Sequence, residues 1–173
     1  LFESAGNSDW NYTIIVIGDR ERLTYSHKKT IYSDASGNAE VLSVSPFEFL
    51  KEYYRKLNQK AYRQKAQELG VGYIDGFIGY IGYDMVQVFE PVLEESMGNL
   101  IDQTDIPDMD LILPKLTLVV SHKNATITML SSLTPMIDRF EEIENVLKSP
   151  YTYTPLRAIE ADKGGEFIFS KEK

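Results

Sequence analysis

The sequence contains no cysteine, and only two of its 173 residues are histidines. Without cysteine the chain has neither a disulfide framework nor a thiolate metal site, which fits a cytoplasmic protein. His27 and His122 both fall in predicted turns and lack a neighbour at metal-ligand spacing, so we interpret each as a surface histidine. Adjacent carboxylates such as Glu141 and Glu142 point in different directions and form no acid/base pair by themselves. We therefore assign no catalytic residue and no metal ligand to this chain.

Positive charge and long apolar runs are also scarce. Lys and Arg number 18 against 26 Asp and Glu, which gives a formal net charge of −8 and a pI near 4.8. Nucleic acids and anionic membranes are bound through clustered Lys and Arg, so neither is an expected partner. No apolar run approaches the roughly 20 residues of a membrane span. The chain begins at Leu1 rather than at methionine, so its N-terminus gives no information on a targeting segment.

What the sequence does contain is enough apolar surface for one domain with a sizeable core, since 43% of its residues are hydrophobic and 12% aromatic. Runs rich in β-branched residues predict strands at the following positions: 12–17, 20–26, 29–33, 40–44, 111–113, 116–121 and 125–130. These strands come in groups rather than alternating with helices. The pattern predicts an α+β fold with a largely antiparallel, two-layered sheet and flanking helices.

Two helices have recognisable starts. Ser45, Pro46 and Glu48 form a capping box with proline in the first turn, and the apolar stripe that follows is Phe47, Leu50, Tyr54 and Leu57. Residues 51–65 give this region a basic face, which is either a solvated surface or a docking surface for a partner. Thr134 and Pro135 repeat the cap signature before a second amphipathic pattern that extends from Met136 to Leu147.

The most unusual stretch is 76–86, in which Gly76, Gly79 and Gly82 alternate with aromatic and aliphatic residues. Glycine has no Cβ, so this spacing allows a second backbone to approach closely, and we interpret the block as a structural joint. It lacks the spacing of a phosphate-binding loop, which argues against nucleotide binding. We predict a strand to Tyr80, a short helix over 83–89, and a surface loop or irregular helix over 94–108.

Pro150, Pro155 and the 162–165 segment change the pattern after Lys148. Proline and glycine without periodicity are typical of a linker. We therefore divide the chain into a domain at 1–149 and a linker at 150–173 that leads into a further domain.

Three segments resemble the N-terminal domain of the anthranilate synthase component I family. They are Gly76 to Asp84, similar to that family's Gly-Gly-x-x-Gly-Tyr-x-x-Tyr-Asp, Leu1-Phe2-Glu3-Ser4, similar to its Leu-Leu-Glu-Ser, and Pro107-Asp108-Met109. The resemblance covers nearly the whole chain, and 166–171 looks like the start of the family's catalytic domain. It implies a fragment that ends where the chorismate-binding domain begins.

For the whole protein, the resemblance implies conversion of chorismate and ammonia to anthranilate and pyruvate with Mg²⁺. The ammonia would come from a glutamine amidotransferase subunit. The chorismate and Mg²⁺ residues would lie in the absent domain, so no cofactor is expected in this fragment. The fragment itself would be a regulatory and scaffolding domain without turnover.

The resemblance also implies part of a feedback site for tryptophan at Phe2, Glu3, Ser4 and Tyr12, with Ser4 at the position of the inhibitor-contacting serine. A carboxylate and carbonyl groups suit the inhibitor's ammonium, and its indole requires an apolar wall. Relatives use a lysine just before the next strand. Asn11 and Tyr12 are the nearest positions here, so the polar contacts would differ.

Two alternatives remain. One is aminodeoxychorismate synthase component I, which shares this architecture, although Glu3 and Ser4 favour anthranilate synthase. The other is a free-standing, non-catalytic ligand-binding module, which the acidic, cysteine-free sequence suits equally well. About 300 further residues encoded after Lys173 would distinguish a two-domain enzyme from such a module.

Overall fold

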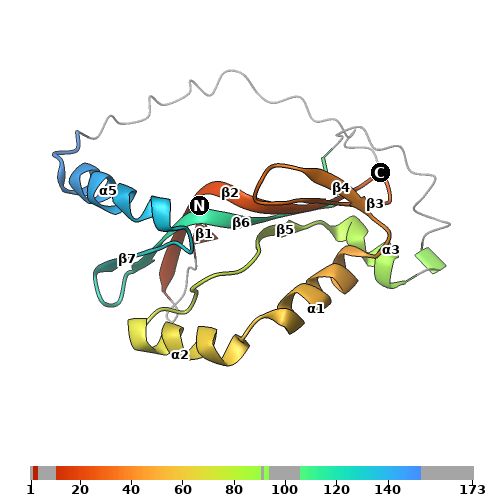
Figure 1. Cartoon of the computed structure of the whole chain (residues 1–173), viewed down its shortest axis with the longest axis horizontal. Helices are drawn as coiled ribbons and strands as arrows, with labels where there is room; N and C mark the ends of the chain where they lie inside the picture. The colour runs from red at the N-terminus through yellow and green to blue at the C-terminus, as the bar shows by residue number, and fades with distance from the viewer. Residues whose placement is uncertain (1, 4–10, 91, 94–105, 153–173) are drawn as a thin grey trace, which may run out of the picture.

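The computed structural model describes residues 2–3, 11–90, 92–93 and 106–152. All strands in these ranges belong to one seven-stranded sheet, and every pairing between them is antiparallel. Helices flank this sheet (Figure 1). The predicted α+β class with an antiparallel sheet is confirmed, and the second layer in the described residues consists of helices.

Two long strands lie next to each other in the interior of the sheet and pair along nearly their full lengths. They are β2 (Tyr12–Ser26) and β6 (Met109–Ser121). Tyr12 lies opposite Ser121 at one end, and Tyr25 lies opposite Met109 at the other. The sequence pattern predicted two strands in each of these segments, with breaks near Gly18 and Pro114, and this was wrong.

A shift in register between Asp19 and Glu21 replaces the predicted break in β2. Gly18 precedes it with a φ of +65°, a conformation that side chains with a Cβ rarely adopt. Asp19 lies opposite Pro114, which has no N–H to donate to the ladder. Because the register shifts at this point, the sheet accommodates both the proline and the positive φ, and β2 and β6 continue past them.

On one side of this shift the sheet continues in the order β4-β3-β2-β6-β5. The added strands are β3 (Lys29–Ser33), β4 (Ala39–Leu42) and β5 (Ile78–Ile81). His27 and Lys28 connect β2 to β3 with φ values of 50° and 59°, as the two central residues of a tight hairpin turn require. On the other side, β1 (Phe2–Glu3) pairs with the start of β2, and β7 (Thr126–Leu130) pairs with the end of β6.

Helix α1 (Pro46–Lys56) begins with the predicted capping box. The Ser45 hydroxyl accepts the Glu48 amide, and the Glu48 carboxylate accepts the Ser45 amide. The helix ends at Leu57, and α2 (Gln59–Leu69) starts anew with Asn58 as its cap. The basic face predicted over 51–65 is therefore divided between two helices.

The core lies between α1 and the part of the sheet that contains β3 and β5. Leu23, Met85, Met109 and Leu111 are buried together there. Leu23, Met109 and Leu111 come from the two long strands, and Met85 comes from η1 (Tyr83–Met85), which leads into α3 (Val86–Phe89). Aromatic and aliphatic side chains of α1 and its surroundings pack against this cluster, among them Phe47, Phe49, Leu50, Tyr32 and Phe77.

Glycine is required at two positions of the 76–86 block by the backbone that passes beside it. A Cβ added to Gly79 would lie 2.0 Å from the carbonyl oxygen of Asp110, and one added to Gly82 would lie 2.8 Å from that of Asp108. Neither obstacle is a side chain that can move aside. The block thus brings β5 and the turn after it against β6.

The last described helix, α5 (Asp138–Lys148), follows a 3₁₀ turn, η2 (Thr134–Met136). The predicted cap at Thr134 was wrong, because the α-helix begins after Ile137 without a side-chain cap. All side chains of α5 are partly or fully exposed, including Val146 and Leu147 on its apolar face. The predicted linker beyond 152 and the 94–105 part of the predicted loop lie outside the described residues.

Candidate functional site

The predicted inhibitor residues fall at the edge of the sheet where β1 meets β2. Glu3 lies opposite Thr13 and Phe2 opposite Ile14, while Ser4 lies outside the described residues. β1 therefore lies beside the first residues of β2, close to Tyr12. The structure brings three of the four predicted positions, Phe2, Glu3 and Tyr12, to one corner.

Tyr12 extends from this corner to the end of α2. Its hydroxyl donates to the carbonyl of Gly70, at 3.3 Å. An open pocket of about 540 Å³ lies there, formed by Tyr12, by Arg63, Ala66 and Gln67 of α2 and by residues 70–72. Tyr12 thus connects the start of the sheet to the left-handed Gly70 that terminates α2.

His122 is exposed, as predicted, but it is bonded to the same corner. Its Nε2 lies 2.7 Å from the Thr13 hydroxyl, and its amide donates to the carbonyl of Asn11 at 3.1 Å. The histidine therefore ties the end of β6 to the start of β2. Thr13 is nearly inaccessible to solvent, so this contact fixes the strand that carries Tyr12.

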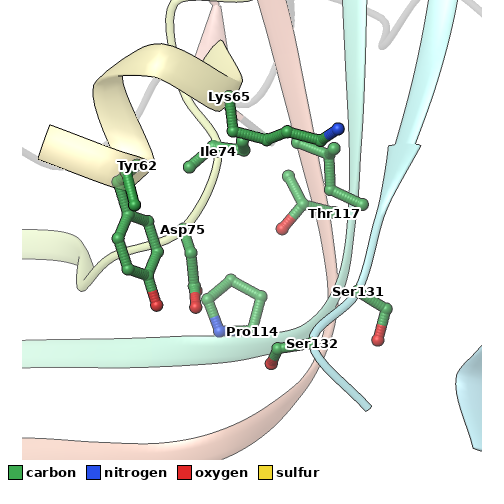
Figure 2. Close-up of a pocket in the computed structure, with 10 residues that line it drawn as sticks. Tyr62, Lys65, Ile74, Asp75, Pro114, Thr117, Ser131 and Ser132 are labelled. Atoms are coloured by element: carbon green, nitrogen blue, oxygen red, sulfur yellow. The ribbon is translucent and has the colours of Figure 1, made fainter. Parts of the chain in front are cut away.

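A second pocket lies between α2 and the paired strands β6 and β7, and we term it the α2 pocket (Figure 2). Its volume is about 360 Å³. Four segments line it: Tyr62 and Lys65 on α2, Ile74 and Asp75 in the following loop, Pro114 and Thr117 on β6, and residues 130–132 at the end of β7. Sequence reasoning missed this site, because its residues are distant in the chain and match no motif.

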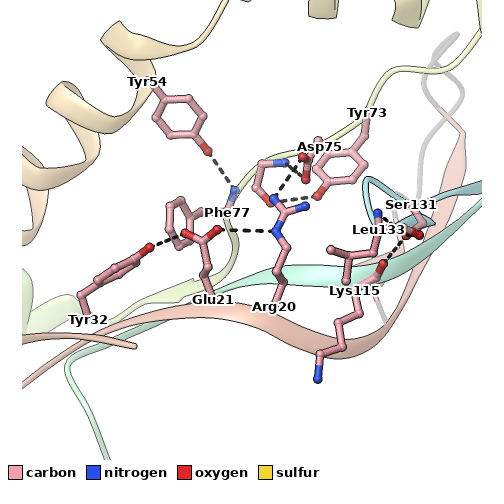
Figure 3. Close-up of polar contacts among 11 residues, drawn as sticks. Arg20, Glu21, Tyr32, Tyr54, Tyr73, Asp75, Phe77, Lys115, Ser131 and Leu133 are labelled. Atoms are coloured by element: carbon pink, nitrogen blue, oxygen red, sulfur yellow. Dashed lines mark hydrogen bonds and ion pairs between the residues drawn. The ribbon is translucent and has the colours of Figure 1, made fainter. Parts of the chain in front are cut away.

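Asp75, which lines the α2 pocket, is anchored by a polar network (Figure 3). Its Oδ2 lies 3.2 Å from Nη2 of Arg20, and its Oδ1 accepts the amide of Gly76 at 3.0 Å. Arg20 also lies 3.5 Å from Glu21, which accepts the hydroxyl of Tyr32 at 2.5 Å. The network joins the irregular part of β2 to the loop before the glycine block.

The field of these charges acts on the nearby tyrosines. Burial lowers the pKa of Arg20, but Asp75 and then Glu21 outweigh this effect and raise it above its ordinary value. Burial, followed by the charge of Glu21, raises the pKa of Tyr53 to about 12. The pKa of Tyr73 is raised by burial and then by Asp75. Asp75 and Glu21 thus add to the effect of burial on the tyrosines around them.

Among the described residues, no group of three or more His, Asp or Glu side chains is placed to hold a metal ion. No described helix is both long and apolar enough to cross a membrane.

Comparison with known proteins agrees with the resemblance predicted from sequence motifs. No protein-family model matches the chain. Anthranilate synthase component 1 of Acinetobacter calcoaceticus is 26% identical over 133 residues, which cover 73% of this chain but 25% of that protein. The crystal structure of anthranilate synthase component I from Streptococcus pneumoniae matches with a TM-score of 0.60 and 18% identity, over 87% of this chain and 32% of that one. This chain thus spans about a quarter to a third of the length of the proteins it resembles, and the predicted resemblance is confirmed.

Proposed function

We propose that this chain is the N-terminal, regulatory and scaffolding domain of an anthranilate synthase component I. The whole protein would convert chorismate and ammonia to anthranilate and pyruvate in the cytoplasm, with Mg²⁺ and a glutamine amidotransferase partner. The similarity to the Acinetobacter protein carries the proposal, since it spans most of this chain but one quarter of the relative. Chorismate and Mg²⁺ would be bound by the remaining part of the protein.

The feedback inhibitor tryptophan would bind at the corner formed by β1 and the start of β2. Glu3 would supply a carboxylate for the ammonium group, and Ser4 a hydroxyl. Two contacts support the choice of this corner. Glu3 pairs with Thr13, and Thr13 is hydrogen-bonded to His122, so β1 lies against a strand that is held in place. The rest of the wall would come from the catalytic domain, so the fragment alone would bind tryptophan weakly.

The first test is an assay of the 173-residue chain with chorismate, ammonia and Mg²⁺, followed by anthranilate fluorescence. We expect no product from the fragment and anthranilate from the protein encoded by the complete reading frame. Aminodeoxychorismate as the product of the complete protein would instead assign it to the folate pathway. Turnover by the fragment itself would overturn its proposed role as a non-catalytic domain.

The second test addresses regulation. In the complete protein we expect Ser4→Ala to relieve tryptophan inhibition while uninhibited turnover stays nearly unchanged, because an allosteric coupling of about 1 to 3 kcal/mol is lost without change at the reacting atoms. Ser36→Ala, in an exposed turn, is the matched control. Calorimetry should show tryptophan binding to the complete protein and little to the fragment. Loss of turnover in Ser4→Ala with inhibition intact would contradict the regulatory site.

A further inference from the structure

The α2 pocket has no part in the proposed function, and its shape and lining suit a small molecule. Tyr62, Ile74, Pro114 and Leu130 form apolar walls, and Pro114 and Thr117 are buried. A volume of about 360 Å³ lies within the range of small-molecule pockets, which begins near 300 Å³. One aromatic ring or a branched aliphatic chain would fit such a space.

Two charged side chains contact the α2 pocket, and they differ in exposure. Lys65 is 60% exposed and already pairs with Glu68 at 3.3 Å. Asp75 is only 20% exposed. Water and salt screen an exposed charge much more strongly than a partly buried one. The carboxylate of Asp75 therefore contributes more to the potential inside the pocket than the ammonium of Lys65.

The groups bonded to Asp75 leave this negative charge incompletely balanced. Arg20 is 13% exposed and is shared between Asp75 and Glu21, so one guanidinium faces two carboxylates. Each carboxylate oxygen of Asp75 accepts one bond, from Arg20 or from Gly76, and has capacity for a second. Burial is the main cause of the raised pKa values of Tyr53 and Tyr73, and the charges of Glu21 and Asp75 add to it, although Arg20 opposes the shift at Tyr53.

We propose that the α2 pocket binds a small organic cation that has an aromatic or branched aliphatic body and a primary ammonium group. The ammonium would lie on Asp75, with the Thr117 hydroxyl as a second acceptor, and the body would lie between the apolar walls. This site shares no residue with the predicted tryptophan corner of Phe2, Glu3, Ser4 and Tyr12. It is therefore independent of the proposed function.

Three probes with the same ring and different charge test the proposal: 2-phenylethylammonium, 2-phenylethanol and 3-phenylpropanoate. Each is titrated into the ¹⁵N-labelled 173-residue chain at neutral pH, and amide shifts are followed by NMR. We expect the ammonium probe to shift the amides of Asp75, Thr117 and Ser132 and to bind at least tenfold more tightly than the alcohol, with the propanoate weakest. Equal affinities, or a preference for the propanoate, would overturn the proposal.

Variants locate the binding. Ala61→Trp fills the mouth of the pocket from an exposed position of α2, and Gln64→Trp places the same side chain on that helix outside the pocket. We expect the first to abolish binding of 2-phenylethylammonium and the second to leave it unchanged. Asp75→Asn should remove the preference for the ammonium over the alcohol, and Ser4→Ala should have no effect. Wild-type affinity in Ala61→Trp would place the probe elsewhere and refute the site, even if Asp75→Asn fails to fold.

Discussion

The two halves of the sheet share the strands β2 and β6 but are packed in different ways. In the half under α1, Leu23, Met85 and Met109 are at most 1% exposed, and aromatic side chains surround them. In the half that contacts α2, Leu116 and Val119 of β6 are also buried, but α2 contributes one aromatic side chain and a pocket lies between the helix and the strands. The same pair of strands thus carries a densely packed helix–sheet interface under α1 and a helix–sheet interface that contains a pocket under α2.

The difference originates in the helices. Helix α1 carries Phe47, Phe49, Leu50, Tyr53 and Tyr54 in eleven residues, whereas the large apolar side chains of α2 are Tyr62 and Leu69 among alanines, glutamines and charged residues. Dense apolar packing provides most of the free energy of folding. We infer that α1 contributes more to stability through its packing against the sheet than α2 does.

The largest effect is expected from Gly79→Val in the α1 half. The new Cβ would occupy space 2.0 Å from the Asp110 carbonyl, so β5 would have to leave β6, at a cost of more than about 4 kcal/mol or with complete unfolding. Urea denaturation measures the change. Gly37→Ala is the control, because a Cβ there meets no atom within 4 Å and only the φ of +83° costs about 1 kcal/mol. An unchanged midpoint for Gly79→Val would contradict the close approach of the two strands.

Truncation of the core comes second. Leu23→Ala removes a side chain that is 0% exposed and should lower the free energy of unfolding by about 2 to 5 kcal/mol. Urea denaturation of Leu130→Ala, on the wall of the α2 pocket, gives the comparison across the two halves, and we expect a smaller loss there because that side chain already borders open space. Equal losses would show that the halves contribute equally.

The polar network between the halves comes third. Arg20→Met leaves Glu21 and Asp75 without their shared guanidinium, and we expect a loss of about 1 to 3 kcal/mol, reduced from the value for a fully buried pair by partial exposure. A double-mutant cycle with Asp75→Asn isolates the coupling between Arg20 and Asp75. Arg139→Met, on the surface of α5, should leave the denaturation curve unchanged. Additive effects of Arg20→Met and Asp75→Asn would show that the two charges do not interact.

A smaller effect is expected from alkaline pH. The folded state raises the pKa of Tyr53 from 10.0 to about 12, mainly by burial, so the unfolded chain loses this proton first. The corresponding stability is present below pH 10 and is lost as the pH rises from 10 to 12. Tyr53→Phe should therefore flatten the decline of the urea midpoint in this interval. A decline of the same slope in Tyr53→Phe would refute this assignment.

The smallest effect is expected on α5. Val146 is 68% exposed, so Val146→Ser should change the free energy of unfolding by no more than about 0.5 kcal/mol. Thermal and urea denaturation would both detect a larger change. A loss above 1 kcal/mol would mean that the apolar face of α5 is packed in solution.

Local signals in the sequence predicted local structure well. The capping box at Ser45 and the hairpin break at His27 and Lys28 each depend on residues within a few positions of one another. The long strands were misread because Gly18 and Pro114 normally end strands, and the pairing that carries the ladder past them involves a partner far away in the chain. Thr134 was misread because a 3₁₀ turn uses the same proline-containing signature as an α-helix.

The same distinction between local and long-range signals applies to the two candidate sites. The corner at β1 was predicted from a contiguous motif, and the structure places Glu3 and Tyr12 in adjacent parts of the sheet. The α2 pocket was not predicted, because Lys65, Asp75 and Thr117 are ordinary residues of a helix, a loop and a strand until the fold assembles them. Patterns report neighbours along the chain, whereas pockets depend on neighbours in space.

The pairing of β2 with β6 also has a consequence for synthesis on the ribosome. Tyr25 pairs with Met109, and Tyr12 pairs with Ser121, so the central ladder cannot form until β6 has emerged from the ribosome. Closing so long a loop is slow, and strands that await a partner expose unpaired edges. Until β6 has been synthesised, the edge of β2 that pairs with it therefore stays open, and a chain that ends before Met109 cannot form the central ladder.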